Sequence, residues 1–234
     1  MKSGRPLDTL YVRRQSGGSA VPLIARAKAA GVVVKEVDGK KLDSMCKNES
    51  HQGIIAVAAL KEYAELEDLF NLAQERGEKP FFIVCDELTD PHNLGAVIRT
   101  ACCTGAHGVI VPKRNSAGLN YTVGKASAGA VEFVPVARVA NIVNTLKKLK
   151  ERGLWIYAAD MDGTDWCTLD YSGAAALVIG SEGNGIGRLV KEHADFIVSL
   201  PMKGSIDSLN ASVAAGVVCY EIARQRSGLR AINP

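Results

Sequence analysis

Three loops of this sequence hold the polar side chains that could do chemistry. In the first, DPHNLGAVIRTA, an amide (Asn93) and a guanidinium (Arg99) follow the apolar run PFFIVCDELT. In the second, VIGSEGNGI, a single acid (Glu182) lies among glycines, which let the backbone turn sharply and let a ligand lie against main-chain amides. The third, LPMKGSIDSLNASVAAG, carries Ser208 and Asn210 into an apolar helix. The small residues of the first loop's helix leave room for a ligand to approach.

Each loop also has a purely structural interpretation. Asn93 could cap a helix while Arg99 lies on the surface, and Glu182 could be a solvated loop acid. Ser208 could be the cap of the last helix. Asn210 is harder to explain in this way, because an amide inside the first turn of a buried helix needs several hydrogen-bond partners.

The elements that would position these loops are strands of a mostly parallel α/β sheet. From residue 80 onward, continuous apolar runs alternate with helical patterns, and such runs are typical of strands buried on both faces. Ligands of these sheets bind beyond the carboxyl ends of the strands, so we expect the chemistry in the loops that open at Asp86, Gly180 and Pro201. The predicted strands are FFIVC, GVIV, VEFVPV, LWIYAA, ALVIG and FIVSL.

Two helices flank these loops. The first can be capped by Asp90 or Asn93 and carries an inward apolar stripe. The last starts at about Ser208 and stays small and apolar until Glu221, so we expect it to be buried nearly all round. The stripe of the first helix consists of Leu94, Val97, Ile98 and Ala101.

A small basic α/β unit precedes this domain. We expect it to span residues 1–62, followed by a connecting helix at 63–78 and the larger domain at 79–234. Residues 1–62 hold 11 Lys and Arg against 6 Asp and Glu, whereas the rest of the chain holds 17 against 19. This asymmetry indicates contact with a polyanion, although a solvated surface would have the same composition. The candidate phosphate contacts are Arg5, Arg13, Arg14 and Lys28.

Composition argues against membrane and metal-binding classes. The apolar runs fall short of the roughly 18 residues that a membrane span needs, and the N-terminus has no apolar signal region, so we expect a cytoplasmic protein. The six cysteines form no C-x-x-C pair and have no histidine nearby at metal-ligand spacing. We therefore expect buried thiols and no metal site.

Together, the three loops resemble the three motifs of the SpoU (TrmH-like) class of RNA ribose 2′-O-methyltransferases, which belongs to the SPOUT group. The segments DPHNLGAVIRTA, VIGSEGNGI and LPMKGSIDSLNASVAAG agree with those motifs in order, spacing and flanking strands. Within the class, the chain is most similar to the RlmB type, which methylates a guanosine of 23S rRNA. The first 60 residues resemble the small ribosomal-protein-like RNA-binding domain that often precedes the catalytic domain.

The resemblance implies a parallel sheet whose C-terminal segment is threaded into a deep trefoil knot. It also implies that S-adenosylmethionine is the cofactor, that RNA is the substrate, and that the chain works as a homodimer whose active site forms where two knots meet. Gly180, Leu200 and Leu209 fall at positions whose backbone contacts the cofactor in the class. The catalytic positions carried over are Asn93, Arg99, Glu182, Ser208 and Asn210.

The role of Arg99 stays open at this point. In the class the arginine is often proposed as the base that takes the 2′-hydroxyl proton, but a free guanidinium has a pKa above about 12. We therefore expect at least partly an electrostatic clamp, which binds the adjacent phosphate and stabilises the developing alkoxide. Glu182 and Asn210 would hold Arg99 and backbone amides in place, and Ser208 could position the ribose.

Alternatives to this interpretation differ in substrate or in class. A tRNA 2′-O-methyltransferase would have nearly identical motifs, and a non-catalytic RNA-binding homologue would be expected to lose some of the five functional side chains. A nicotinamide enzyme using GSEGNGIG is disfavoured because the spacing is not G-x-G-x-x-G. A hydrolase built on His92 with Ser181 or Asp90 lacks the G-x-S-x-G elbow. Relatives usually carry a further segment before SGRPLDTLYV, so we expect the RNA-binding unit to be shortened at its start.

Overall fold

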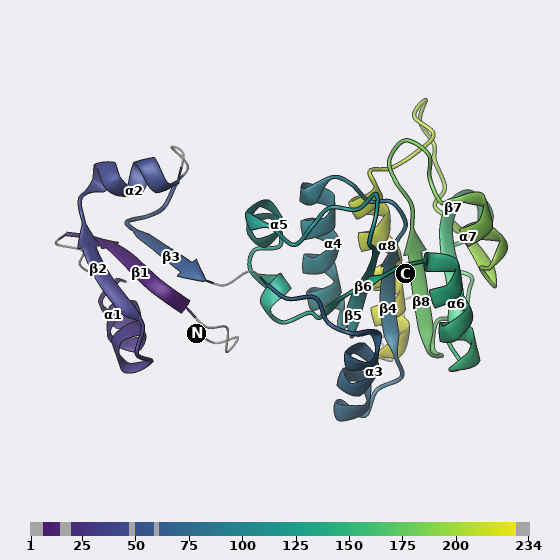
Figure 1. The fold of residues 1–234 in the computed structure, drawn as a ribbon. Helices are drawn as coiled ribbons and strands as arrows, with labels where there is room; N and C mark the ends of the chain where they lie inside the picture. The colour runs from purple at the N-terminus through teal and green to yellow at the C-terminus, as the bar shows by residue number, and fades with distance from the viewer. Residues whose placement is uncertain (1–6, 15–19, 47–49, 59–60, 228–234) are drawn as a thin grey trace, which may run out of the picture. The chain divides into compact units, whose positions relative to one another are not determined.

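The chain folds into two compact units, Met1–Leu60 and Lys61–Pro234. The structure is a computed structural model and describes residues 7–14, 20–46, 50–58 and 61–227. Figure 1 shows the elements of both units. The division falls two residues before the boundary at 62 that the sequence predicts.

The smaller unit is a three-stranded sheet with two helices. β1 is the central strand; it pairs in parallel with β2 and antiparallel with β3. Alternate residues of β1, Leu10 and Val12, are buried against α1. The second helix was not predicted, although Asp38 caps it by accepting from the backbone N–H of Lys41 at 2.7 Å. The elements are β1 (Leu7–Arg13), α1 (Ala20–Ala29), β2 (Val33–Val37), α2 (Gly39–Met45) and β3 (Ile54–Ala58).

The larger unit is a six-stranded sheet in the order β6-β5-β4-β8-β7-β9, and all of its strand pairs are parallel. This confirms the predicted parallel α/β sheet. Its strands are β4 (Phe81–Cys85), β5 (Gly108–Pro112), β6 (Val136–Val139), β7 (Trp155–Asp165), β8 (Ala175–Ile179) and β9 (Phe196–Ser199). Its helices are α3 (Leu66–Glu75), α4 (Pro91–Thr104), α5 (Tyr121–Ala126), the 3-10 turn η1 (Ala130–Glu132), α6 (Ile142–Glu151), α7 (Arg188–Glu192) and α8 (Ala211–Arg226).

Strand residues alternate between two hydrophobic cores, one on each face of the sheet. Ile83 of β4 packs with residues of α4, α5 and α8, whereas its neighbours Phe82 and Val84 pack with residues of α3, α6 and α7 (Figure 1). Every residue of β4 and β8 is buried, which explains their unbroken apolar sequences. The predicted stripe Leu94, Val97, Ile98 and Ala101 is confirmed, since all four side chains are fully buried.

Two element predictions were wrong in detail. The run VEFVPV is not one strand, because residues 130–132 form a 3-10 turn, Phe133 is exposed, and β6 starts only at Val136, after Pro135. The last helix starts at Ala211, with Asn210 rather than Ser208 as its cap.

Burial was also overestimated at two places. Helix α8 is not buried all round, since Val213 and Tyr220 are 50% and 59% exposed. The uniformly apolar sequence could not show this, because it marks no polar face. All six cysteines are free, but only Cys85 and Cys219 are buried, while Cys102, Cys103 and Cys167 are exposed.

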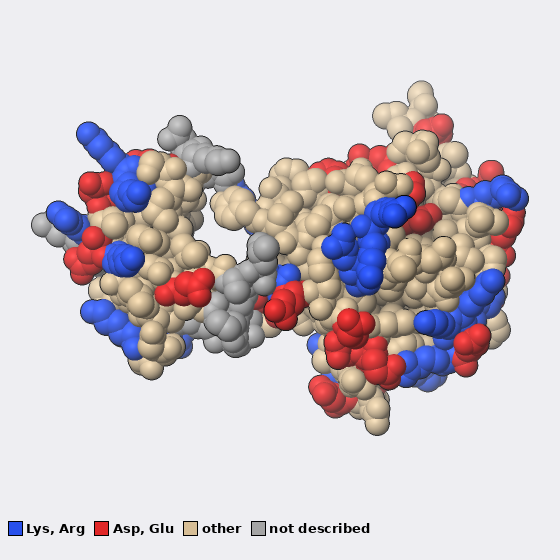
Figure 2. Space-filling view, in the orientation of Figure 1, with Lys and Arg blue, Asp and Glu red and all other residues tan. Residues whose placement is uncertain are grey.

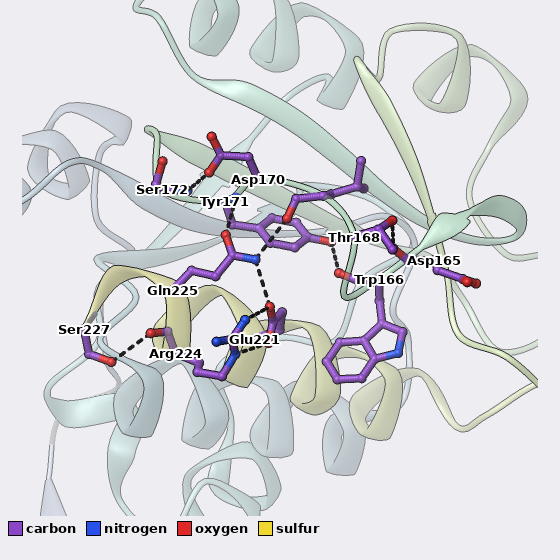
Figure 3. A network of polar contacts seen from close by, with 11 residues as sticks. Asp165, Trp166, Thr168, Asp170, Tyr171, Ser172, Glu221, Arg224, Gln225 and Ser227 are labelled. Atoms are coloured by element: carbon purple, nitrogen blue, oxygen red, sulfur yellow. Dashed lines mark hydrogen bonds and ion pairs between the residues drawn. The ribbon is translucent and has the colours of Figure 1, made fainter. Parts of the chain in front are cut away.

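The C-terminal turn of α8 is fastened to the segment that joins β7 to β8 (Figure 3). Gln225 accepts from the backbone N–H of Tyr171 at 2.8 Å and donates to the carbonyl of Leu169 at 2.9 Å. Its amide also donates to Glu221, which forms an ion pair with Arg224. These bonds tie the end of the chain's last helix to a segment more than fifty residues earlier.

Candidate active site

Helix α4 begins at the carboxyl end of β4 and carries Asn93 in its first turn. Asp90 caps the helix by accepting from the backbone N–H of His92 at 2.9 Å, and Pro91 takes the first helical position, where no N–H is needed. Asn93 is therefore not a cap. Its side chain is 5% exposed and must find partners across the sheet.

The glycine loop after β8 places Glu182 opposite Asn93. Ser181 and Gly185 exchange two backbone hydrogen bonds, of 2.9 and 3.0 Å, and close a tight turn around Glu182. Gly185 has a φ of +63°, which favours glycine. A Cβ at Gly180 would lie 2.1 Å from the carbonyl carbon of Gly185, so only glycine permits the turn to fold back on the strand.

Asn93, Glu182 and Asn210 form a closed set of side-chain hydrogen bonds. Asn93 Nδ2 donates to Glu182 Oε1 at 2.6 Å, and Asn210 Nδ2 donates to the same oxygen at 2.5 Å and to Asn93 Oδ1 at 3.0 Å. The other end of Asn210, Oδ1, caps α8 by accepting from the backbone N–H of Ser212 and Val213. The three loops that the sequence singled out thus meet in one polar cluster.

The segment between β9 and α8, residues 200–209, is exposed along most of its length. Within the described chain it makes no backbone–backbone hydrogen bond, so its N–H and C=O groups are available to a ligand. It also exposes apolar side chains, Met202 at 38%, Ile206 at 74% and Leu209 at 42%. Free main-chain groups next to apolar side chains suit a ligand that has both hydrogen-bonding groups and apolar surface.

Arg99 and Ser208 stand apart from this cluster. The side chain of Arg99 is exposed on α4 and makes no hydrogen bond or ion pair with any other described residue. Within one chain, Glu182 and Asn210 are engaged with Asn93 and make no bond to Arg99, so the expectation that they hold Arg99 stays a prediction. Ser208 is exposed, and its hydroxyl donates to Asp207 at 3.3 Å.

The sequence profile of the SpoU rRNA methylase family matches residues 80–220, which include all three loops. The chain belongs to the SpoU rRNA methylase family. A second profile, described as RNA 2′-O ribose methyltransferase substrate binding, matches residues 1–64. The chain is thus an RNA methyltransferase of the SpoU/TrmH class with a substrate-binding domain.

Relatives that match nearly the whole chain include a Bacillus subtilis protein assigned to the TrmH family of tRNA/rRNA methyltransferases (YacO). It is 50% identical over 229 residues, which cover 97% of this chain and 92% of the relative. A TrmH-family protein of Staphylococcus haemolyticus is 43% identical, covering 96% and 90%.

Solved methyltransferase structures share the fold. The AdoMet-bound rRNA methyltransferase of Sinorhizobium meliloti superposes with a TM-score of 0.80 at 26% identity, covering 98% of this chain and 83% of that one. AviRb of Streptomyces viridochromogenes, in complex with AdoMet, gives 0.79 at 25% identity, covering 97% and 86%.

The structural role of one residue, Asp86, was missed, because the sequence marked it only as the start of a loop. Asp86, the first residue after β4, is buried, and its Oδ2 accepts from the backbone N–H of Gly187 at 2.8 Å. Burial raises the pKa of this carboxyl; the Gly187 hydrogen bond lowers it, and the charge of Glu87 raises it. An acid directly after a fully apolar strand was the available signal. Asp86 joins the β4 loop to the far end of the glycine loop.

The four candidate RNA contacts do not all meet in the substrate-binding unit. Arg5 lies outside the described residues. Arg13 and Arg14 are exposed at the end of β1, near the start of α2. Lys28 is exposed in the last turn of α1, just before the start of β2. The start of β2, at Val33, pairs with Thr9 near the beginning of β1. Lys28 therefore lies at the opposite end of the sheet from the two arginines.

Among the described helices, none combines the length and apolar character that a membrane crossing requires. The described residues also contain no group of three or more His, Cys, Asp or Glu side chains placed to hold a metal ion.

Proposed function

We propose that this protein transfers a methyl group from S-adenosylmethionine to the ribose 2′-hydroxyl of a guanosine in large-subunit (23S) rRNA. The observation that carries the proposal is the closed Asn93–Glu182–Asn210 hydrogen-bond set, which unites one residue from each SpoU loop. A chain that had kept the fold alone would have no reason to keep all three polar side chains at hydrogen-bond distance.

The cofactor would lie against the loops after β8 and β9. Gly180, Leu200 and Leu209 would contact it through their backbones, since residues 200–209 leave their main-chain groups free within the described chain. The relatives of known structure from S. meliloti and S. viridochromogenes were solved with AdoMet, which supports this assignment. When bound, S-adenosylmethionine supplies an electrophilic methyl group on a sulfonium.

The polar cluster would fix the cofactor loops and the nucleotide relative to each other. Glu182 uses only Oε1 for Asn93 and Asn210, so Oε2 is left for a donor on the substrate or cofactor. Ser208, exposed beside Asn210, would position the ribose. Correct placement alone can contribute a large share of the rate of such a transfer.

Arg99 would act as an electrostatic clamp at the reacting oxygen. Its guanidinium is exposed and makes no bond in the described part of its own chain, so its donors are available for a phosphate and for the developing alkoxide. If the arginine were instead the base, a pH–rate profile would show one ionisation that vanishes in both Arg99→Ala and Arg99→Lys. In the clamp role, Arg99→Lys keeps part of the activity.

We also propose that two copies of the chain form the working enzyme. Arg99 makes no bond to Glu182 within one chain, and the first turn of α8, next to Asn210, exposes the apolar side chain of Val213. A partner subunit that covers this apolar face would bring its own arginine to the cluster.

A trefoil knot in the C-terminal segment would bring the elements of this dimer surface together. After β7 the chain returns inward to β8, moves outward to β9, and comes back as α8 to pack on α4. This path is the one that threading of the C-terminal segment through the preceding loops would require.

Substrate choice can be tested directly with labelled cofactor. The full chain is incubated with methyl-labelled S-adenosylmethionine and either undermodified ribosomal RNA or unmodified tRNA. Label in 23S rRNA alone supports the proposal. Label in tRNA alone keeps the reaction and replaces the substrate, while no cofactor binding at all contradicts the proposed function.

A further inference from the structure

The loop that follows β5 presents two cations at the edge of the sheet that holds the active site. Lys113 and Arg114 are both exposed, and neither has a hydrogen-bonded or charged side-chain partner among the described residues. We call this pair the β5 ledge. Figure 2 shows Lys and Arg side chains gathered over the part of the larger unit where Figure 1 places β6, the neighbour of β5.

On one side, residues of β6 hold the ledge in place. The backbone N–H of Lys113 donates to the carbonyl of Val139 at 2.8 Å, and the guanidinium of Arg138 donates to the carbonyl of Lys113 at 2.9 Å. Arg138 in turn lies over the ring of Tyr63, 5.1 Å from its centre. The backbone of the ledge is therefore fixed while its cationic side chains project into solvent.

On the other side the ledge is tied to the catalytic loop. Asn115 donates to Glu87 Oε1 at 2.9 Å, and the backbone N–H of Ala117 donates to the carbonyl of Leu88 at 2.9 Å. The stretch from residue 86 to 90 holds three carboxylates, and all are engaged: Asp86 accepts from Gly187, Glu87 from Asn115, and Asp90 caps α4. The same loop leads directly to Asn93.

Strand order places the ledge between β6, which pairs with the start of the larger unit, and the reacting groups. Ala64, at the end of the matched substrate-binding segment, pairs with Ala137 of β6. Next in the sheet come β5 with the ledge, then β4 with Asn93, then β8 with Glu182. Neighbouring strands are about 5 Å apart, so the ledge is within reach of nucleotides that flank a ribose bound at Asn93.

We propose that Lys113 and Arg114 bind backbone phosphates of the RNA next to the reacting nucleotide. The inference rests on the proposed function and extends it, because it gives the catalytic unit its own RNA contact in addition to the substrate-binding unit. Two cations without partners among the described residues, on a backbone fixed by hydrogen bonds, suit phosphates, which are read without regard to base identity. Such contacts release counterions and make binding depend on salt.

The test compares two double variants of the full chain. Lys113→Ala/Arg114→Ala removes the ledge. Lys147→Ala/Lys148→Ala removes the same charge from exposed positions on α6, which covers the face of the sheet opposite to α4 and α8. Affinity for unmodified 23S rRNA is measured between 50 and 200 mM salt, together with cofactor affinity and thermal unfolding.

The ledge variant is expected to flatten the plot of log affinity against log salt by about 1.4, or roughly 0.7 for each lost phosphate contact. The affinity advantage of the unmodified chain over the ledge variant then falls about sevenfold from 50 to 200 mM salt. Cofactor affinity and unfolding should not change. The variant Lys113→Arg/Arg114→Lys should keep the original slope.

Three results would overturn the inference: an unchanged slope in the ledge variant, an equal change in the α6 variant, or no RNA binding by the unmodified chain. The first two leave the proposed function intact as long as the unmodified chain transfers methyl groups. Failure of the unmodified chain to bind the cofactor would instead contradict the proposed function itself.

Discussion

Asn93 Nδ2 lies 2.6 Å from Oε1 of Glu182, although the two residues are 89 positions apart in the chain. The bond bridges the loops after β4 and β8, which are neighbouring strands of the sheet. Asn210 adds a third loop by donating to the same oxygen. The polar cluster therefore exists only when all three loops are folded against one another.

This cluster should behave as a unit in mutagenesis. Glu182→Ala leaves the buried amide of Asn93 without its acceptor and is expected to lower the methyl-transfer rate roughly a hundredfold. Asn210→Ala should do the same, and the double variant should lose little more, because coupled partners are not additive. Rates of single and double variants at saturating cofactor give the coupling. Fully additive losses would show that the two residues act independently.

Gly180→Ala should damage the cofactor site while the sheet stays folded. The added Cβ would lie 2.1 Å from the carbonyl carbon of Gly185, so the turn that carries Glu182 must move away. Gly183→Ala is a matched control in the same loop, since a Cβ there meets no atom within 4 Å. We expect calorimetry to show weaker cofactor binding for Gly180→Ala alone. Equal affinity in both variants would contradict the close-packing argument.

Stability should fall on mild acidification because of His107. This side chain is fully buried; its Nδ1 accepts from the backbone N–H of Phe81 at 3.0 Å, and its Nε2 contacts Glu78 at 2.9 Å. Burial lowers its pKa in the folded state, although Glu78 opposes the effect. The unfolded chain, with a pKa of about 6.5, then binds the proton more readily.

The stabilising contribution of neutral His107 is consequently complete above about pH 6.5 and is lost as the pH falls toward the lower pKa of the folded state. Denaturant unfolding at pH 7.5 and 5.5 measures this loss. His107→Asn keeps an acceptor for the Phe81 N–H and should lose less stability between the two pH values. An identical loss in both proteins would assign the acid sensitivity to other groups.

Gln225 should contribute to the stability of the C-terminal helix. Gln225→Ala removes its hydrogen bonds to Tyr171, Leu169 and Glu221 and leaves backbone groups unpaired, at a cost of about 1–3 kcal/mol in the free energy of unfolding. Gln74→Ala, at an exposed position of α3, is the control. A difference near zero between the two variants would mean that water replaces these bonds without loss.

The shared site of the proposed dimer can be tested by mixing defective subunits. If Arg99 serves the partner's Glu182, co-expressed Arg99→Ala and Glu182→Ala chains form mixed dimers that each keep one complete site. About half of the dimers are mixed in an equal population, so activity recovers to about a quarter of that of the unmodified enzyme. No recovery above the single variants would place Arg99 and Glu182 of one site in the same subunit.

The strands and the three loops were predictable because buried parallel strands are apolar throughout and end abruptly at polar residues. The stripe from Leu94 to Ala101 followed from helical spacing alone. The start of β6 could not be predicted, because an apolar residue such as Val131 can be buried in a 3-10 turn as well as in a strand. Local sequence does not distinguish the two.

Within the site, residue types could be predicted but partners could not. Asn210 was expected to need several partners, and it uses both ends of its amide, one to cap α8 and one to hold Glu182. That Asp86 reaches Gly187 across 101 residues could not follow from spacing along the chain. Such contacts depend on strand order, which places β8 beside β4.

The most direct test of the central claim identifies the methylated atom. RNA labelled by the enzyme is hydrolysed in alkali, which cleaves every linkage except one that follows a 2′-O-methylated ribose. We expect the label in an alkali-resistant dinucleotide that begins with guanosine, and we expect Arg99→Ala to reduce it strongly at unchanged cofactor affinity. Label recovered in mononucleotides would place the methyl group on a base and contradict ribose methylation at this site.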